Sequence, residues 1–535
     1  MFWIPRVASA IARVKSAIPS VSNARQCLII PAFPPFPAEL SPLPLTDEQR
    51  AVVQAEAPIL KVNAVAGSGK TTTLLEFAAH RPGQRILYLA YNRAVAEEVR
   101  AKALERDLGH IKVKTIHALA YQYAQGFNYE LVGELNEWQL LEEYVPASMQ
   151  DDEDALVYAW LIKDLINYYL NSSLVPLDDD LLAAYAADTL PCGPTLGVLE
   201  DRGGELLGVV SMVLSDMKQR RIPALHDFYL KLFQFMRTQL PYDIILVDEA
   251  QDTSGVMLHI IGRQEHAQRV FVGDSFQQIY AFRHAVNSLE RVDGMACHLS
   301  QTFRFGDGLA RHLSEQVNDA YALLGEGKAL NMRGTEVQTR FGTDSVRSRR
   351  KPLAVIARSN LGLFEAVLDR LQNGHKSMYF EGGYPGYNFM NGRVVSLLNL
   401  KEGKRGQVDD PLIRQFASFA QARRFAKDTQ NPALANLVDL VSRYGAKLYS
   451  FDREIKSRLT SKDRAQLVFT TTHKAKGQEY DAVEMADGDF STREDLEKQL
   501  DSATETLNPA KLREEVNVYY VAATRARQAI QLASF

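Results

Sequence analysis

The segment from Ala57 to Thr72, APILKVNAVAGSGKTT, limits the possible fold more than any other part of the sequence. A short apolar run leads into a glycine-containing loop, and the helical pattern KTTTLLEFAAH follows. This order of strand, loop and helix matches the phosphate-loop pattern, with Ala64 in place of the first glycine. We expect Gly67 and Gly69 to let successive backbone N–H groups face a phosphate group.

Two side chains of this loop carry the expected chemistry. Lys70 supplies a point charge near the β and γ phosphates, and the Thr71 hydroxyl faces Mg²⁺. A chance match is the alternative, but the loop follows a predicted strand and opens a predicted helix, as the chemistry requires. The predicted nucleotide-binding residues of the loop are Ala64, Ala66, Gly67, Ser68, Gly69, Lys70, Thr71 and Thr72.

The motif IILVDEAQD predicts the second half of a nucleotide site. Its apolar run is typical of a buried strand, which delivers Asp248 to the phosphate end of a sheet. We expect Asp248 to hold Mg²⁺ through water, beside the Thr71 hydroxyl. Glu249 is expected to accept a proton from the attacking water. The alternative is that these carboxylates only cap a helix at the end of a strand.

Alternating strand and helix patterns indicate the α/β class with parallel sheets covered on both faces. Helical spacing without strand signals in two blocks indicates mainly helical insertions. We therefore expect two parallel-sheet domains, each carrying one insertion, after a basic, proline-rich leader at 1–44. The expected boundaries are 45–121 and 236–289 for the first domain, 122–235 for its insertion, 290–384 and 465–535 for the second domain, and 385–464 for its insertion.

Composition limits the class of protein less sharply. With 535 residues, the chain is long enough for three or four units at roughly 100–200 residues each. The formal net charge of -4 does not suggest a nucleic-acid binder, although a basic groove would suffice for one. The three cysteines form no CxxC pair, and no apolar run is long enough for a membrane span. The basic leader resembles a transit peptide, and a disordered segment or a surface helix are its alternatives.

Nine motifs carry a resemblance to a known family. They are LTDEQ, AVAGSGKTT, LAYNRAVAEEV, TIHALAY, LVDEAQD, VGDSFQQIYAFRHA, LSQTFRF, TTHKAKGQEYD and VYYVAATRA. In this order the chain resembles superfamily 1A DNA helicases of the UvrD/Rep type over residues 45–535. Details of three motifs are most similar to the F-box DNA helicase branch. The leader contains no recognisable F-box, so we do not expect coupling to a ubiquitin ligase. The resemblance implies two RecA-like domains of the phosphate-loop NTPase class.

The resemblance also implies roles at the nucleotide. Gln49 resembles the residue that recognises the adenine edge, and Phe303 resembles the aromatic that stacks on the base. Gln277 resembles the sensor that links the γ-phosphate to the DNA-facing loop. Glu479 resembles the acid near the nucleotide sugar and the cleft between the domains.

Arg304 and Arg525 resemble the paired arginines that reach the nucleotide from the second domain. An arginine supplied across a cleft is worth about 10³–10⁵ in the rate of phosphoryl transfer. Such an arginine also makes catalysis depend on closure of the cleft. The alternative for Arg525 is a solvated arginine at the end of a helix.

DNA contacts are expected from residues near the strand ends. Aromatic side chains stack on bases without recognising their sequence, and Phe282 matches the family position under the strand. A core role is the alternative for Phe282, and a structural role is the alternative for the two histidines. The basic run RSRRK is either a phosphate contact or a solvated loop. The predicted DNA-binding residues are Tyr91, Asn92, Thr115, His117, Tyr280, Phe282, Arg283, Thr471 and His473.

We therefore predict an ATP- and Mg²⁺-dependent 3′ to 5′ DNA helicase or single-stranded DNA translocase, acting in repair or recombination. One alternative is a translocase that displaces proteins and unwinds weakly. Another is a nucleic-acid-sensing ATPase of a defence or toxin system. A helicase–nuclease is not expected, since ten residues follow Arg525. Expected partners are single-stranded and tailed duplex DNA, with recombinase filaments or single-strand-binding protein as further candidates and no membrane. We expect a monomer in the bacterial cytoplasm, or in the nucleus or mitochondria of a eukaryote.

Overall fold

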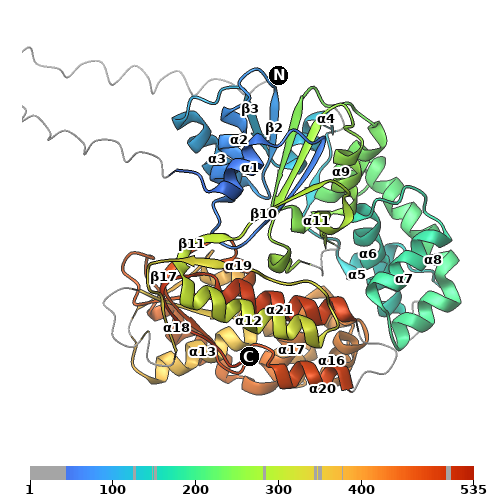
Figure 1. Cartoon of the computed structure of the whole chain (residues 1–535). Coiled ribbons are helices and arrows are strands. Elements are labelled where there is room, and N and C mark those ends of the chain that lie inside the picture. Colours follow the sequence, from blue (N-terminus) through green and yellow to red (C-terminus); the bar gives the residue numbers. More distant parts are fainter. Residues whose placement is uncertain are drawn as a thin grey trace, which may run out of the picture. The chain divides into compact units, whose positions relative to one another are not determined.

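A computed structural model describes most of the chain, and its residues from Thr46 to Phe535 form one compact unit. Two six-stranded sheets form the centres of a first lobe and a second lobe (Figure 1). Of the predicted leader, only Pro44 lies within the described residues. The described residues are 44–124, 128–147, 149, 154–280, 285–342, 346, 352–375, 377–501 and 508–535.

The first sheet has the strand order β10-β1-β8-β6-β2-β3, and its neighbouring strands are all parallel. Strands β2 and β6 are buried along their whole length, as expected when helices cover both faces of a parallel sheet. The strands are β1 (Ile59–Ala64), β2 (Ile86–Leu89), β3 (Ile111–Lys114), β6 (Ile244–Asp248), β8 (Gln268–Gly273) and β10 (Met295–Leu299).

Strand β10 differs from the sequence prediction. The sequence assigns residues from 290 onward to the second domain, but β10 pairs with β1 in the first sheet. Its burial pattern explains the difference, because only Cys297 and Leu299 are buried in this edge strand. An edge strand of this kind gives no signal of the sheet that it joins.

Helices cover the first sheet on both faces. Helix α1 begins with a capping box, in which Thr46 and Gln49 satisfy each other's backbone N–H groups. Helices α4 and α9 pack together on the face formed by Leu87, Leu89 and Ile245. The helices are α1 (Asp47–Gln54), α2 (Lys70–Ala79), α3 (Arg93–Glu105), α4 (Ile116–Ala124), α9 (His226–Met236), α10 (Gly255–Gly262) and α11 (Ser288–Arg291). A short antiparallel pair, β7 (Thr253–Ser254) and β9 (Ala285–Val286), accompanies them.

A helical insert separates α4 from α9. Its helices are α5 (Glu137–Glu143), α6 (Ala155–Asn171), α7 (Asp179–Thr189) and α8 (Pro194–Lys218). The parallel pair β4 (Leu131–Val132) and β5 (Ala224–Leu225) joins the two chain segments that enter and leave it. Helix α6 is buried around most of its circumference, which explains its nearly continuous apolar sequence. Within the described ranges, no helix combines the length and the apolarity needed to cross a bilayer.

The second sheet has the order β13-β18-β17-β14-β16-β15 and is also parallel throughout. The predicted fold class, two RecA-like parallel-sheet domains, is therefore confirmed. A separate parallel pair, β11 (Gln301–Gly306) and β12 (Arg333–Thr335), contacts helix α12 (Asp307–Leu323). The strands are β13 (Arg340–Phe341), β14 (Leu353–Ala357), β15 (Met378–Phe380), β16 (Leu467–Thr471), β17 (Tyr480–Met485) and β18 (Ala526–Gln531).

Further helices belong to the second lobe and its insert. Helix α21 packs against α12 and belongs to the same hydrophobic cluster as Val65, Ala66 and Phe276 of the first lobe. The helices of the second lobe are α13 (Asn360–Gln372), α19 (Thr472–Ala475), α20 (Arg493–Asp501) and α21 (Pro509–Ala523). Those of the insert are α14 (Gly392–Lys401), α15 (Pro411–Gln415), α16 (Phe419–Asp428), α17 (Pro432–Tyr444) and α18 (Lys447–Ser457).

Candidate functional site

The phosphate loop connects β1 to α2 and depends on two glycines. Gly67 and Gly69 have φ values of 75° and 77°, which L side chains rarely adopt. A Cβ atom on Gly67 would lie 2.6 Å from Thr302 Oγ1, so a neighbouring segment approaches the loop closely. The N–H group of Phe303 donates a hydrogen bond to Gly67 O at 2.8 Å. Strand β11 therefore contacts the phosphate loop directly.

Gln49 and Phe303 both lie beside Gly69, where a Cβ atom would be 3.2 Å from Gln49 Nε2 and 3.9 Å from the Phe303 ring. Gln49 is buried, and its Nε2 donates to Ser68 O at 3.3 Å. The capping box of α1 fixes the Gln49 amide, because its Oε1 accepts from Thr46 N. The Phe303 side chain is 45% exposed, although it is a large apolar ring. An amide and an accessible aromatic ring at one end of the loop are suited to binding a planar base.

Three adjacent strands end at the phosphate loop. In the order β1-β8-β6, they are followed by the loop itself, by Asp274 and by Asp248 with Glu249. Lys70 Nζ lies 3.5 Å from Glu249 Oε1. Burial alone would lower the pKa of Lys70, but the nearby carboxylates of Glu249, Asp274 and Asp248 outweigh it, and the pKa is raised. Lys70 is therefore a charged ammonium group at neutral pH.

The pKa values of the two adjacent carboxylates are shifted in opposite directions. Burial, reinforced by the negative charge of Glu249, raises the pKa of Asp248 to about 6. Burial also acts to raise the pKa of Glu249, but Lys70 and Lys476 overcome it and lower that pKa to about 2. Tyr88 Oη donates to Asp248 Oδ2 at 2.7 Å, and the Thr71 hydroxyl also interacts with Tyr88. Thr71 and Asp248 thus share one neighbour.

Arg304 approaches the site from strand β11. Its guanidinium donates to Thr524 O at 2.8 Å and forms an ion pair with Glu479 at 2.6 Å. The buried Nε atom of Arg304 has no hydrogen-bond partner among the described residues. The charge of Arg304 opposes the rise in the pKa of Lys70, so the two cations lie close enough to repel each other. The Arg304 charge therefore belongs to the same electrostatic cluster as the phosphate loop.

Arg525 is 1% exposed and lies at the end of α21. Its guanidinium donates to Val521 O at 2.8 Å, Thr524 Oγ1 at 3.0 Å and Gln478 O at 3.4 Å. Burial, together with repulsion from Arg304, lowers the pKa of Arg525 to about 9. The carboxylate of Glu249 opposes this change, so Arg525 and Lys70 both act on the same carboxylate. Residues far apart in the sequence are thus brought together here.

A hydrogen-bond network links the predicted sensor Gln277 to the phosphate loop. Gln277 Nε2 donates to Asp274 Oδ2 at 2.8 Å. Tyr520 Oη donates to the same oxygen at 3.0 Å and accepts from the N–H group of Ala66 at 3.2 Å. Because Tyr520 belongs to α21, this network joins the phosphate loop to the second lobe.

Several residues of this cluster had no assigned role in the sequence prediction. Lys476 forms a buried ion pair with Asp252, and its Nζ donates to Gln277 O at 2.6 Å. Gln251 Nε2 donates to Glu249 Oε2 at 2.5 Å. Lys476 and Tyr520 lie inside the quoted motifs TTHKAKGQEYD and VYYVAATRA, but the motifs do not indicate which members face the cleft. Tyr88 carries no signal beyond its place in an apolar strand.

The residues present fit a nucleotide with a divalent cation. Besides Arg304 Nε, the buried Ser68 Oγ lacks a partner among the described residues, and both atoms adjoin the loop. No group of three or more His, Cys, Asp or Glu able to hold a metal occurs in the described part of the chain. Thr71 and Asp248 nevertheless supply oxygen ligands, and Mg²⁺ usually takes only one or two carboxylates from the protein, with water and phosphate oxygens completing its shell.

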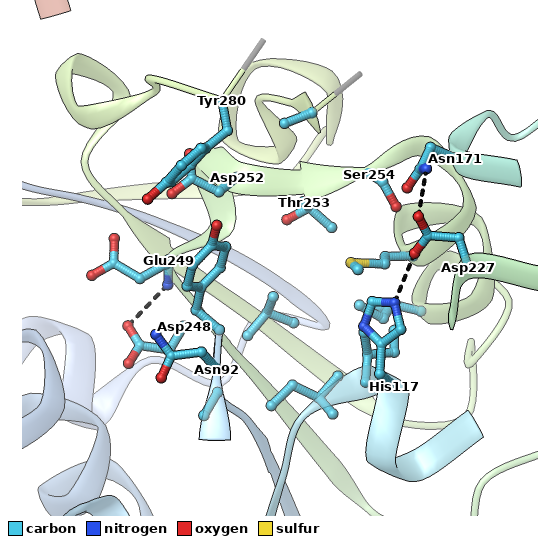
Figure 2. Close-up of a pocket in the computed structure, with 18 of the residues that line it drawn as sticks. Asn92, His117, Asn171, Asp227, Asp248, Glu249, Asp252, Thr253, Ser254 and Tyr280 are labelled. Carbon is cyan, nitrogen blue, oxygen red and sulfur yellow. Dashed lines mark hydrogen bonds and ion pairs between the residues drawn. The ribbon is translucent and has the colours of Figure 1, made fainter. Parts of the chain in front are cut away.

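A cavity of about 550 Å³ lies beside this cluster (Figure 2). Its lining includes Asp248 and Glu249, so it reaches the nucleotide cluster from the side of β2 and β3. The rings of Tyr91 and Tyr280 stack at one wall with centroids 5.7 Å apart. His473 contacts Tyr280 at 5.8 Å and its Nε2 lies 3.0 Å from Ile279 O, while burial lowers its pKa to about 4. The cavity thus brings the predicted DNA-binding residues Tyr91, Asn92 and Tyr280 together, and His473 packs against the Tyr280 ring.

His117 lies on the opposite side of the same cavity (Figure 2). Its Nε2 lies 2.9 Å from Asp227 Oδ1, and Asn171 Nδ2 donates to the other carboxylate oxygen at 3.0 Å. Although burial opposes it, the hydrogen bond to His117 lowers the pKa of Asp227. This pairing connects α4 to α9 and α6, so His117 has a structural role in addition to any contact with a ligand.

Several of the predicted DNA-binding residues also make local hydrogen bonds. Asn92, which lines the cavity, caps α3 by accepting from Val95 N at 2.9 Å. Thr115 accepts from Ala118 N at 3.1 Å. Thr471 is buried at the end of β16. Their roles at DNA stay predictions. Phe282, Arg283 and the run RSRRK lie outside the described residues.

Comparison with known proteins gives two family matches that together cover nearly the whole chain. A model described as "AAA domain" matches residues 48–283, and a model described as "UvrD-like helicase C-terminal domain" matches residues 206–535.

Two curated relatives are also similar. The "F-box DNA helicase protein 1" of Schizosaccharomyces pombe is 27% identical over 530 residues, covering 91% of this chain and 57% of that protein. The "F-box DNA helicase 1" of Gallus gallus is 26% identical over 524 residues, covering 92% of this chain and 49% of that protein. The chain spans about half the length of these relatives.

Proposed function

Because the chain belongs to the UvrD-like helicase family, we propose that it is an ATP-dependent DNA helicase that moves along single-stranded DNA. The proposed direction is 3′ to 5′, and the proposed setting is DNA repair or recombination. The names of the two curated relatives, both DNA helicases, support DNA as the substrate.

The nucleotide half of the proposal assigns roles to the cluster at the phosphate loop. Gln49 and Phe303 bind the adenine, and Glu479 lies near the sugar. Lys70 and the loop N–H groups bind the phosphates, while Thr71 and Asp248 hold Mg²⁺, which would neutralise phosphate charge. Glu249 orients the attacking water and accepts its proton, and Gln277 senses the γ-phosphate.

One observation carries this half of the proposal. Lys70 Nζ of the first lobe lies 3.5 Å from Glu249 Oε1, and the charge of Arg525 of the second lobe acts on the same carboxylate. Arg304 adds a second cation beside the loop. Phosphoryl transfer is catalysed mainly by positioning and by stabilisation of phosphate charge. Hydrolysis therefore depends on contact between the lobes, and the opening and closing of that contact provides the motion.

The DNA half of the proposal rests on the cavity of Figure 2. The stacked rings of Tyr91 and Tyr280 offer aromatic surfaces for bases. The same cavity is lined by Asp248 and Glu249, so a strand held there adjoins the nucleotide cluster. Lys476 extends the connection, because its ammonium group lies 5.0 Å from the centre of the Tyr280 ring and pairs with Asp252.

ATP hydrolysis measured with and without single-stranded DNA tests the proposal, followed by unwinding of duplexes with a 3′ or a 5′ tail. We expect DNA to stimulate turnover and only the 3′-tailed duplex to be unwound. Lys70→Ala should reduce turnover by on the order of 10³-fold or more while DNA binding is kept. Lys102→Ala, on the exposed face of α3, is the matched control.

Three outcomes would count against the proposal. ATP turnover that DNA does not stimulate would contradict the proposed motor function. Retained turnover in Lys70→Ala would contradict the assigned nucleotide site. Unwinding of the 5′-tailed duplex alone would reverse the proposed direction. Displacement of a protein bound to the strand, measured on the same substrates without unwinding, would identify a protein-displacing translocase instead.

A further inference from the structure

Helices α4 and α9 expose aromatic rings on the surface of the first lobe. Tyr121 and Tyr123 of α4 are 43% and 37% exposed, and Phe235 of α9 is 43% exposed. The two helices lie side by side against the first sheet (Figure 1). A soluble protein usually buries most of its large aromatic side chains, so a group of them on one surface suggests a ligand.

These rings continue those that line the cavity. His117 lines the cavity and contacts the ring of Tyr229 at a centroid distance of 6.1 Å. Tyr121 contacts the same ring at 5.4 Å, and Tyr123 stacks on Phe233 at 4.8 Å. Because Tyr229 and Phe233 are buried, they hold the exposed tyrosine rings in fixed positions. An aromatic surface thus extends from the cavity to the end of α4.

Basic residues border this surface. Lys112 and Lys114 lie on the edge strand β3, opposite Leu87 and Leu89 of β2, whose side chains belong to the cluster under α4 and α9. The two lysines therefore point to the face of the sheet that carries α4. Lys114 Nζ donates to Gln122 Oε1, between the two tyrosines in the sequence.

The positive charge at this edge is not neutralised. No ion pair involves Lys112, Lys114 or Arg100 among the residues that the structure describes. Burial lowers the pKa of Lys114, and the repulsion of Lys112 and Arg100 lowers it further. A cluster of unpaired cations beside accessible aromatic rings is complementary to a polyanion that carries flat bases.

We infer that Tyr121, Tyr123, Lys112 and Lys114 form a binding site for single-stranded DNA that continues the strand held in the cavity. The inference rests on the proposed function, since the site would lengthen the proposed path of single-stranded DNA. The rings would stack on bases whatever their sequence, and the lysines would pair with phosphates. A strand that occupies only the cavity would not reach this site, whereas a longer strand would.

The dependence of affinity on strand length tests this site. Oligothymidylates of about 6 and about 16 nucleotides span the range that one binding unit covers. We compare the full chain with Tyr121→Ala/Tyr123→Ala and with Lys112→Gln/Lys114→Gln. Tyr449→Ala/Lys447→Ala, which removes one exposed tyrosine and one exposed lysine from α18, is the matched control. Tyr121→Phe/Tyr123→Phe keeps the rings and should keep the affinity.

We expect the tyrosine double variant to bind the short strand as the parent does and the long strand about tenfold or more weakly for each ring removed. The lysine variant should reduce the log–log salt slope for the long strand by about 0.7 per lost phosphate contact. ATP turnover without DNA should not change in either variant, and thermal melting should match that of the parent.

Equal long-strand affinity in the parent and the tyrosine variant would overturn the inferred site, as would an equal loss for short and long strands. If the unmodified chain binds neither strand and DNA does not stimulate its ATP turnover, the proposed function itself is wrong. A variant that loses length dependence while the parent keeps DNA-stimulated turnover supports the site. The two failures are therefore distinguishable.

Discussion

The first and second lobes each contain a six-stranded parallel sheet, but they differ in the charges that they bring to the phosphate loop. The first lobe supplies the loop with Lys70, the buried carboxylates Asp248 and Asp274 and the half-buried Glu249. The second supplies Arg525 and Lys476, while Arg304 arrives on β11 beside it. One lobe thus holds most of the proposed phosphate site, and the other contributes mostly cations.

This difference indicates where the two lobes of the proposed motor are coupled. Carboxylates buried in the first lobe without nearby cations would raise the free energy of the folded state, because a buried charge needs a partner. Lys70 of the first lobe is one such partner, and Lys476 and Arg525 of the second lobe add others when the lobes touch. The electrostatic balance of the site therefore depends on the contact between the lobes, which is the property that a nucleotide-driven closure requires.

Removing the cation on β11 should have the largest effect. Arg304→Ala should lower ATP turnover by about 10³–10⁵-fold, because stabilisation of phosphate charge from across the cleft is lost. Steady-state hydrolysis with saturating DNA measures this change. Arg311→Ala removes an exposed arginine of α12 and should leave turnover unchanged. Near-normal turnover in Arg304→Ala would mean that the chemistry does not require this cation.

The second test concerns the buried ion pair between Asp252 and Lys476, which joins the two lobes. Lys476→Met should lower the free energy of unfolding by about 3–5 kcal/mol, because it leaves a buried carboxylate without its partner. Denaturant unfolding followed by fluorescence measures the loss. The double variant Asp252→Leu/Lys476→Met should recover most of it, since apolar partners of similar size replace the pair. No recovery would show that the lysine acts through its other partner, Gln277 O.

A smaller effect is expected from Tyr520, which also contributes to the contact between the lobes. Its hydroxyl bridges Ala66 N and Asp274 Oδ2, so Tyr520→Phe removes two hydrogen bonds between the lobes without changing the packing of the ring. We expect turnover to fall by about tenfold, as for the loss of about 1.4 kcal/mol. Tyr519→Phe, which changes the neighbouring hydroxyl on α21, is the control and should be nearly silent. An equal effect in both variants would contradict the role of the bridge.

The last effect, which is the smallest for each unit of pH, concerns a lysine that donates to backbone carbonyls of each insert. In the first, Lys231 Nζ is buried and donates to Ser172 O and Leu174 O, and burial lowers its pKa to about 7 from the ordinary 10.5. Between these two values the unfolded chain binds more protons than the folded chain. Stability should therefore rise with pH from about 7 to about 10.5, by roughly 1 kcal/mol per unit, and be lost as pH falls toward 7.

Unfolding midpoints at several pH values measure this dependence. Lys231→Met should remove most of the rise between pH 7 and pH 9. In the second insert, Lys401 Nζ donates to Val441 O and Ser442 O in the same manner, but it is exposed. Lys401→Met should therefore leave the pH dependence unchanged. If both variants flatten the curve equally, burial is not the cause.

The sequence alone determined those parts of the protein that depend on neighbouring residues. The phosphate loop is a local structure, because Gly67 and Gly69 supply the backbone conformations and Lys70 follows them directly. Asp248 follows a continuous apolar run, so its place at the end of a buried strand could also be predicted. The order of the motifs indicated the family, and the alternation of strand and helix indicated the parallel sheets.

Only the tertiary structure decided the partners of those residues. Tyr520 and Ala66 lie 454 positions apart, and Asp252 and Lys476 lie 224 positions apart. No local pattern specifies which tyrosine or lysine within a motif will face a distant segment. Strand β10 joined the first sheet for a similar reason, because pairing between strands depends on backbone hydrogen bonds that any sequence can form. Contacts between distant segments depend on the packing of the whole chain, whereas motifs depend only on adjacent residues.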